Sequence, residues 1–253
     1  MKSSLILFIL FLACSPAVQA QELTLKTQDF PPYAYLIDDK LSGPAVEIIH
    51  ATCEQADLEC HMELLPWARA QDAVKHGKDN GLFVLAKTPE RTAWLAFSYP
   101  LFEANYGFFV RSQNLLEYTA PSDISGYHIG VYGPSNTSKR LESIVSQAKG
   151  CTVEMRPDDE AGFKKLNHGR IDAVYSNKYV GDALISKMHL RMTRYAGTEG
   201  KVLYYLAFSK RNTEEETIKR FNEAYLKLHE DGSIAKILDT YNMKPVPIKC
   251  PIE

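Results

Sequence analysis

The stretch Gly81-Leu82-Phe83-Val84-Leu85-Ala86 decides the fold class of this chain. A short apolar run without a polar interruption is typical of a strand that is buried on both faces of a sheet. Working back from it, we predict a helix over residues 66–76, a strand over 60–64, a helix that begins at Pro44 and a strand over 23–27. This βαβαβ alternation predicts a mainly parallel sheet covered by helices.

The same alternation restarts in the second half of the chain. Strands are predicted over residues 127–131, 152–155 and 171–175. A helix that is capped by Ser135-Asn136-Thr137 and runs to residue 148 is predicted after the first strand, and further helices are predicted over 158–168 and 177–187. The last helices are expected to begin at a capping box formed by Thr213 and Glu216 and again after Gly232, and to return to the first unit.

Two short extended segments, residues 105–110 and 203–208, lie between the units. A pair of extended crossings is what a hinge between two lobes requires. We therefore predict an α/β, two-lobed fold in which two α/β sandwich lobes are joined by a two-strand hinge. Lobe 1 is expected to span residues 21–104 plus 207–253, and lobe 2 residues 105–206. One continuous doubly wound sheet is the alternative.

Residues 1–20 have the layout of a secretory signal peptide. Lys2 is a short positive region, residues 5–13 are apolar, and Val18-Gln19-Ala20 is a small-residue cleavage site. The apolar run is too short to span a bilayer as a helix. A buried N-terminal helix is one alternative, and a lipid anchor at Cys14 is another, because residues 11–14 resemble a lipoprotein cleavage box.

Cleavage after residue 20 would leave Cys53, Cys60, Cys151 and Cys250. An even number of cysteines in an exported chain favours disulfides over metal ligation. A turn between a helix and a strand can bring Cys53 to Cys60, and Cys151 with Cys250 follows by elimination. The histidines are scattered, so we expect no metal site and no cofactor. The formal net charge of -2 gives no indication of a nucleic-acid partner.

Several motifs follow one another along the chain: Phe30-Pro31-Pro32-Tyr33-Ala34-Tyr35, Thr88-Pro89-Glu90-Arg91 with Phe97-Ser98-Tyr99-Pro100, Asp123-Ile124-Ser125-Gly126, Gly169-Arg170-Ile171-Asp172-Ala173-Val174, and Asp231-Gly232-Ser233-Ile234-Ala235-Lys236-Ile237. In this order they resemble family 3 of the bacterial extracellular solute-binding proteins, the polar amino-acid-binding components of ABC importers. The resemblance implies a ligand held between two lobes, an inner-membrane ABC permease as partner and a periplasmic location. We expect a monomer, and the Cys53–Cys60 spacing also resembles a disulfide of some members.

Arg91 is the first candidate ligand residue. It follows the carboxyl end of a buried strand, where ligands bind in open α/β sheets, and its guanidinium matches a carboxylate bidentately. The resemblance implies that it grips the carboxylate of the ligand. A solvated surface arginine is the alternative.

Ser135, Asn136 and Thr137 open a helix whose free N–H groups can hold an anion. The resemblance implies that this turn contacts the carboxylate from the opposite lobe, whereas plain helix capping is the simpler interpretation. Phe30 and Trp67 are candidate aromatic walls, with Tyr33 and Tyr132 as further candidates, and core packing is their alternative. Arg69 is a candidate second cation, and a solvated helix face explains it equally well.

Residue 177 departs from the family pattern. Family members place an aspartate five positions after the residue equivalent to Asp172, where it pairs with the ammonium of the ligand, and this chain has Asn177 there. A desolvated ammonium without a counter-charge is costly, so Asp29 or Glu103 would have to supply the negative charge. Val84 and Ala86 stand where small or hydroxylated residues are usual. We keep Asn177 as a candidate ligand residue.

Two rival functions remain at this point. One is a periplasmic dehydratase on the same scaffold, in which a carboxylate in the cleft acts as general acid. The sequence has no arrangement for nucleophilic catalysis, so we expect a protein that is not an enzyme and has no catalytic residues. The other is a sensing module that reports its ligand to a membrane signalling receptor instead of a permease.

Overall fold

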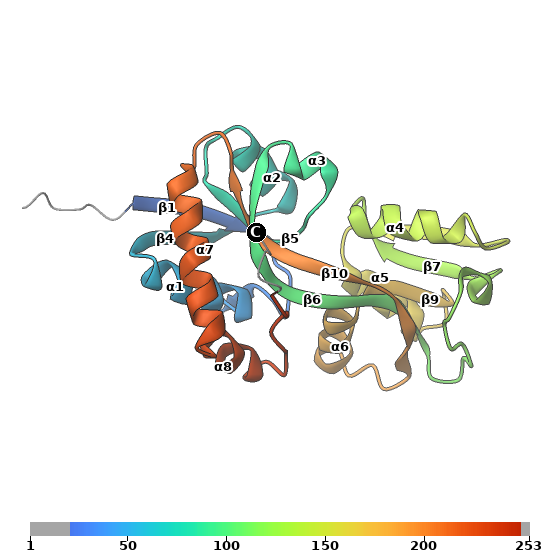
Figure 1. The fold of residues 1–253 in the computed structure, drawn as a ribbon. Coiled ribbons are helices and arrows are strands. Elements are labelled where there is room, and N and C mark those ends of the chain that lie inside the picture. The colour runs from blue at the N-terminus through green and yellow to red at the C-terminus, as the bar shows by residue number, and fades with distance from the viewer. Residues whose placement is uncertain (1–20, 249–253) are drawn as a thin grey trace, which may run out of the picture.

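The computed structural model describes residues 21–248. In it, two α/β lobes are joined by the long strands β6 (Leu95–Arg111) and β10 (Thr193–Ser209) (Figure 1). The predicted signal peptide over residues 1–20, the alternative anchor at Cys14 and the distal residue Cys250 lie outside the described residues.

Lobe 1 contains the strands that surround the apolar stretch Gly81–Ala86. Strand β1 (Gln21–Thr27) lies between the parallel strands β4 (Leu58–Leu64) and β5 (Gly81–Ala86). A two-stranded hairpin and five helices complete the lobe: β2 (Tyr35–Ile37), β3 (Lys40–Ser42), α1 (Pro44–Gln55), α2 (Trp67–Lys75), α3 (Pro89–Thr92), α7 (Glu215–Glu230) and α8 (Ser233–Asp239).

Strand β5 is buried because helices cover both of its faces. Leu82 packs in a cluster with Ala70 and Val74 of α2 on one face, whereas Phe83 belongs to the larger cluster that contains Ile48 and Ile49 of α1. Helices α7 and α8 pack beside α1, so the end of the described chain returns to lobe 1 (Figure 1). This two-sided burial explains why the sequence of β5 is apolar throughout.

Helix α1 begins where the sequence predicts it, with Pro44 in its first turn. A proline suits this position because the first N–H groups of a helix have no partner inside the helix. Gly43 precedes it with φ 114°, and an added Cβ there would lie 2.5 Å from the carbonyl oxygen of Tyr33. Only glycine fits this close approach, which holds the loop of Tyr33 against the start of α1.

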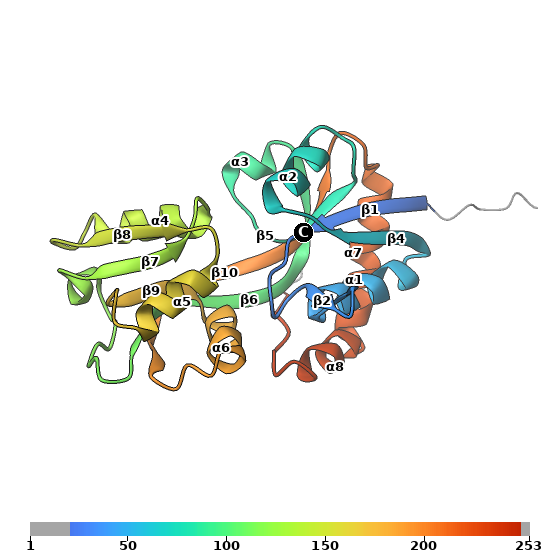
Figure 2. The same cartoon turned by 180° about the vertical axis from the view of Figure 1, so that it is seen from behind.

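Lobe 2 repeats the arrangement with strand β7 (His128–Tyr132) between the parallel strands β8 (Thr152–Arg156) and β9 (Ala173–Asn177). Helix α4 (Asn136–Val145) covers one face of this sheet, and α5 (Asp159–Asn167) and α6 (Lys178–Lys187) lie on the other (Figures 1 and 2). A short 3₁₀ turn, η1 (Pro121–Ile124), leads into β7.

The two crossings are longer than the sequence predicts, since each is a strand of 17 residues. Strands β6 and β10 pair antiparallel along their length; β5 pairs with the lobe 1 end of β10 and β9 with the lobe 2 end of β6. Hydrogen bonding is therefore continuous in the order β4-β1-β5-β10-β6-β9-β7-β8, although each lobe has its own covering helices. The predicted fold class is confirmed, and the residue boundaries between the lobes stay a prediction.

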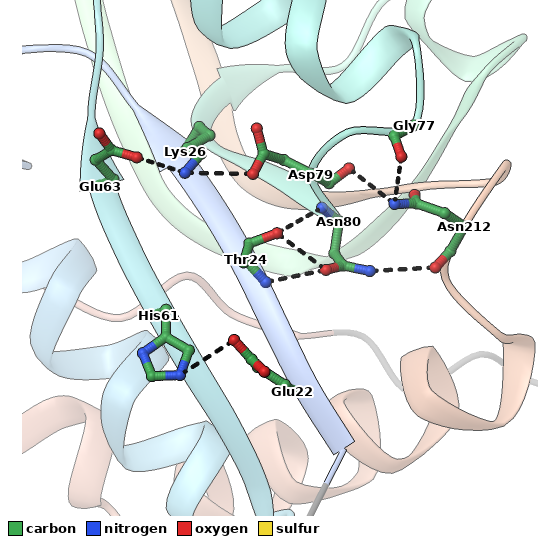
Figure 3. A network of polar contacts seen from close by, with 9 residues as sticks. All are labelled: Glu22, Thr24, Lys26, His61, Glu63, Gly77, Asp79, Asn80 and Asn212. Atoms are coloured by element: carbon green, nitrogen blue, oxygen red, sulfur yellow. Dashed lines mark hydrogen bonds and ion pairs between the residues drawn. The ribbon is translucent and has the colours of Figure 1, made fainter.

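A polar network fixes the loop that leads into β5 (Figure 3). Asn80 Oδ1 accepts hydrogen bonds from the Thr24 amide and hydroxyl at 3.0 and 3.1 Å, and its Nδ2 donates to the carbonyl of Asn212. Asn212 Nδ2 in turn donates to the carbonyl of Gly77. These bonds tie β5 to β1 and to the turn after β10, so β5, which leads to the loop and short helix that carry Arg91, enters the sheet in a fixed position.

One predicted helix start is wrong. Thr213 does not form a capping box, because α7 begins at Glu215 after Glu214 without a side-chain cap. The Thr213 hydroxyl instead donates to the carbonyl of Asn80 at 3.2 Å, next to the network of Figure 3. The Thr213 side chain therefore forms a long-range hydrogen bond instead of capping the helix that follows it.

The cysteines follow the sequence prediction in part. Cys53 of α1 and Cys60 of β4 form a disulfide, which confirms that pair. Cys151 has a free thiol that donates to the carbonyl of Ile124. Its expected partner Cys250 lies outside the described residues, so the bridge between them stays a prediction.

Candidate ligand-binding site

A cavity of about 660 Å³ lies between the lobes, at the carboxyl end of β5. Its walls come from lobe 1, from lobe 2 and from the two crossing strands. The lobe 1 wall contains Gln28, Phe30, Trp67, Val84, Leu85, Ala86, Lys87, Thr88 and Arg91; the lobe 2 wall Tyr132, Ser135, Asn136, Thr137, Arg140, Asp159, Ser176 and Asn177; and the strands contribute Tyr106, Lys201, Val202, Leu203, Tyr204 and Tyr205. This volume is in the range of small-molecule sites.

Strand β5 is irregular where it reaches the cavity. Val84 has φ 58°, a left-handed conformation that is unfavourable for a β-branched residue. Phe83 and Val84 both pack in the cluster that contains α1, whereas Leu82 and Leu85 pack in the cluster that contains α2, so the alternation of faces is interrupted at this point. The partner strand shows a register shift between Tyr205 and Leu206. The irregularity redirects the end of β5, where Ala86 and the following loop enter the cavity wall.

Arg91 lies on the short helix α3 that follows this loop. Thr88 caps the helix and its hydroxyl accepts a hydrogen bond from the Arg91 amide at 3.3 Å. The guanidinium donates to the carbonyl of Ala86 at 2.8 Å and to Gln71 Oε1 at 3.4 Å, and its Cζ lies 5.6 Å from the centre of the Trp67 ring.

These contacts orient the guanidinium of Arg91 without neutralising it. Within residues 21–248, no carboxylate forms an ion pair with Arg91. Burial lowers its pKa, and the charge of Glu90 offsets this only in part. An arginine stays charged under these conditions, so the lobe 1 wall presents a fixed cation that is oriented and unpaired.

The start of α4 faces the same cavity from lobe 2. Ser135 is the N-cap, and its hydroxyl accepts a hydrogen bond from the Ser138 amide at 3.2 Å, as predicted from the sequence. The amides of Asn136 and Thr137 precede that bond, and in the part of the chain that the structure describes they have no hydrogen-bond partner. Unsatisfied amides at the positive end of a helix form a site for an anion.

Asn177 lines the cavity, but its hydrogen-bonding groups are already used. Its Oδ1 caps α6 by accepting from the amides of Tyr179 and Val180, at 2.9 and 3.4 Å. Its Nδ2 donates to the hydroxyls of Tyr33 and Tyr204, at 3.0 and 3.3 Å. The Tyr204 hydroxyl also bonds that of Tyr106. Asn177 therefore joins the lobes through Tyr33 and has no donor left for a ligand.

Two predicted ligand residues do not reach the cavity wall. Tyr33 is fully buried, and its ring packs against those of Phe102 and Tyr204 beneath the cavity. Arg69 is exposed on α2, because residues two apart on a helix point to different sides and Trp67 is the one that faces the cavity. Tyr33 and Arg69 therefore lie outside the wall, whereas the other predicted residues line it: Phe30, Trp67, Arg91, Tyr132, Ser135, Asn136, Thr137 and Asn177.

The two residues expected to supply a negative charge lie outside the cavity wall. Asp29 is exposed and does not line the cavity, and Glu103 pairs with Lys201 at 2.6 Å. Among the described residues, the acidic one in the wall is Asp159, at the start of α5. It follows the carboxyl end of β8, so the rule that pointed to the residues after β5 and β7 would have found it.

Arg140 is a second residue that the sequence analysis missed. It lies four residues after Asn136 on α4 and therefore on the same face of the helix. Its Nε donates to Glu199 at 2.6 Å and its Nη2 to the other oxygen at 3.2 Å, and the Tyr175 hydroxyl donates to the same carboxylate at 2.7 Å. Glu199 of β10 thus fixes Arg140 in the wall and neutralises its charge.

The cavity therefore contains cations of two kinds. Arg140 and Lys201 have acidic partners, whereas Arg91 and Lys87 have none among the described residues; the Lys87 ammonium lies 5.6 Å from the centre of the Phe97 ring. The unpaired positive charge is concentrated on the lobe 1 wall, opposite the free amides of α4. Chemically, this arrangement can hold a small anionic group between the two lobes.

Over residues 21–248 there is no group of three or more His, Cys, Asp or Glu side chains that could hold a metal ion. A search of the same residues for helices long and apolar enough to cross a membrane also finds none.

A two-lobed body with a cavity lined from both lobes defines a ligand-binding clamp. The chain belongs to the bacterial extracellular solute-binding proteins, family 3, whose family model matches residues 24–244. This confirms the family predicted from the motifs, and with it the role of binding a solute outside the cytoplasmic membrane.

Relatives and solved structures agree with this assignment. The chain is 26% identical over 222 residues to the "Probable amino-acid-binding protein YxeM" of Bacillus subtilis. The matched region covers 86% of this chain and 82% of the relative. Its fold is similar to that of an ancestral arginine-binding protein bound to arginine, with a TM-score of 0.75, 23% identity, and coverage of 87% of this chain and 97% of the other. A histidine kinase sensor domain is also similar in fold, with a TM-score of 0.79, 18% identity, and coverage of 90% and 99%.

Proposed function

We propose that this protein captures an amino acid in the periplasm for an ABC importer, with the carboxylate of the ligand held between Arg91 and the start of α4. The observation that carries the proposal is the placement of an unpaired guanidinium and unsatisfied helix amides on opposite walls of one cavity. Membership of family 3 and the similarity to a relative named as an amino-acid-binding protein support the class of ligand.

The proposed mechanism is closure of the two lobes on the ligand. Arg91 belongs to lobe 1 and Ser135 to lobe 2, so a carboxylate that contacts both favours the conformation in which the lobes are close. The ligand shifts this equilibrium only by its additional affinity for the closed form. The crossing strands β6 and β10 are the connection about which the lobes move. A membrane permease would then recognise the closed form.

The aromatic side chains complete the site. Phe30 and Trp67 line the lobe 1 wall, and Tyr132 lines the lobe 2 wall. Tyr106 and Tyr204 line the cavity from the two crossing strands. Burial raises the pKa of both side chains, so their hydroxyls remain neutral and serve as hydrogen-bonding groups. These residues supply apolar contact and neutral polar groups, while Arg91 supplies the charge.

Calorimetry of the mature chain against the common L-amino acids tests the proposal. Arg91→Ala is expected to weaken binding of the tightest ligand at least about 30-fold, equivalent to about 2 kcal/mol, because it removes one partner of a desolvated charge pair. Arg69→Ala is the matched control, since Arg69 is exposed on the same lobe and outside the cavity wall. This control is expected to bind like the wild type.

Thermal unfolding without ligand separates binding from folding, because Arg91 also bonds Ala86 and stacks near Trp67. Unchanged affinity in a folded Arg91→Ala protein would remove Arg91 from the site. An equal loss in the Arg69→Ala protein would show that general charge, rather than the cavity, determines binding.

A further inference from the structure

Asp159 has the only carboxylate among the described residues that line the cavity. It begins α5, directly after the N-cap residue Asp158, whose side chain accepts from the amide of Ala161 at 2.6 Å. Asp158 therefore satisfies the helix end, and Asp159 is not needed for capping. Its side chain is directed into the cavity wall beside Ser176.

The carboxylate of Asp159 is unpaired. Its one hydrogen bond to a described residue comes from the Ser176 hydroxyl, at 2.7 Å, and it forms no ion pair within residues 21–248. The titratable groups that act on it or feel its charge are Asp158, Tyr106 of β6 and Tyr132 of β7, and none of them is a cation. A carboxylate offers about four lone-pair positions, so most of its accepting capacity is free.

The cations of the cavity do not neutralise Asp159. Arg140 is paired with Glu199 and Lys201 with Glu103. Arg91 and Lys87 belong to the opposite wall. Asn177, the next residue along β9 from Ser176, has both of its donors engaged by tyrosine hydroxyls and its oxygen engaged in capping. Asp159 is half-buried in the cavity wall, and a partly desolvated charge without a partner is costly, so a cation that enters the cavity would be stabilised beside it.

We propose that Asp159 is the counter-ion for a protonated amino group of the ligand, which makes the cavity selective for a zwitterion over a simple carboxylic acid. The inference rests on the proposed function, since it takes the ligand's carboxylate to lie between Arg91 and α4. The unpaired charges of the cavity then have a complementary pattern, positive on lobe 1 and negative on lobe 2. A zwitterion satisfies both and bridges the lobes.

The ionisation of Asp159 gives this interaction a pH dependence. Burial raises the pKa of Asp159 to about 6, the Ser176 hydrogen bond lowers it, and the nearby Asp158 raises it further. Only the ionised carboxylate attracts an ammonium ion, so affinity for an amine-bearing ligand should rise as the pH increases through about 6. Among the described residues no histidine lines the cavity, so Asp159 is the lining group expected to titrate there.

The test compares Asp159→Asn with Asp158→Asn by calorimetry at pH 5 and pH 7.5. The probes are the L-amino acid that binds the wild type most tightly and analogues that each lack one of its amino groups. Asp159→Asn is expected to weaken binding of the amino acid at least about tenfold at pH 7.5 and to abolish the difference between the two pH values. Asp158→Asn removes the same charge one residue away, outside the cavity wall, and is expected to bind like the wild type at pH 7.5, where Asp159 is ionised in both proteins.

The analogues identify the amino group that Asp159 contacts. The analogue that lacks the contacted amino group should bind the wild type at least about tenfold more weakly than the amino acid does. Asp159→Asn should not weaken the binding of this analogue any further. Thermal unfolding without ligand checks that each variant is folded, and Asp159→Glu, which keeps the charge, should restore part of the affinity and the pH dependence if Asp159→Asn unfolds.

Each outcome decides between the two proposals. Wild-type affinity in Asp159→Asn, or equally tight binding of every analogue by the wild type, would overturn the role of Asp159. If Arg91→Ala loses affinity in the same series, the proposed function stands without the role of Asp159. If the wild type binds none of the amino acids, both the proposed ligand class and the role of Asp159 fail.

Discussion

The disulfide between Cys53 and Cys60 should contribute a measurable part of the stability of lobe 1. It joins the end of α1 to β4 across a sequence separation of 7 residues. Closing a loop of this length in the unfolded chain corresponds to about 2.4 kcal/mol of stabilisation in the chain-entropy description. Removing the bridge should therefore increase the equilibrium constant for unfolding about 60-fold.

Urea denaturation of the Cys53→Ala/Cys60→Ala protein, compared with the wild type, measures this contribution. In a second experiment, dithiothreitol reduces the Cys53–Cys60 disulfide of a Cys151→Ala protein, which lacks the free thiol of lobe 2. Cys151→Ala alone is the matched control and should cost less than about 1 kcal/mol, since Cys151 makes one weak hydrogen bond to Ile124. A loss below about 0.5 kcal/mol in the double variant would refute the reasoning from loop closure.

Two further substitutions test contacts that surround the cavity. Tyr33→Phe removes the hydroxyl that joins lobe 1 to Asn177 and should destabilise the protein by about 1–2 kcal/mol in chemical denaturation, because a buried donor loses its partner; a change near zero would contradict this interlobe bond. Gly200→Ala would place a Cβ 2.0 Å from Arg140 Nη2, so the guanidinium must move away from Glu199. Its effects on ligand affinity and on stability should overlap with those of Arg140→Ala in a double-mutant cycle, and strictly additive effects would show that the two residues are independent.

The elements that sequence could predict are those determined by neighbouring residues. The cap at Ser135, the first-turn proline at Pro44 and the apolar run of β5 depend on local chemistry, and all are present in the structure. Position alone also placed Arg91 and the start of α4 at the cavity wall, because both follow the carboxyl ends of parallel strands. The same rule applied to β8 would have identified Asp159.

What sequence could not predict depends on contacts between distant segments. Thr213 carries a capping pattern, but its hydroxyl bonds Asn80, 133 residues away in sequence. Arg140 is neutralised by Glu199, a separation of 59 residues, and nothing in the sequence of α4 or β10 indicates that pairing. Tyr33 resembles a wall residue in its motif, yet it is buried because aromatic rings from β6 and β10 close around it.

The position of the bound ligand is the most direct test of the clamp. A crystal structure of the mature chain with its tightest-binding amino acid should place the carboxylate within hydrogen-bond distance of both the Arg91 guanidinium and the first amides of α4, with the lobes closed on it. A ligand that contacts only one lobe, or that leaves the Arg91 guanidinium without an anionic partner, would contradict the proposed capture between the lobes.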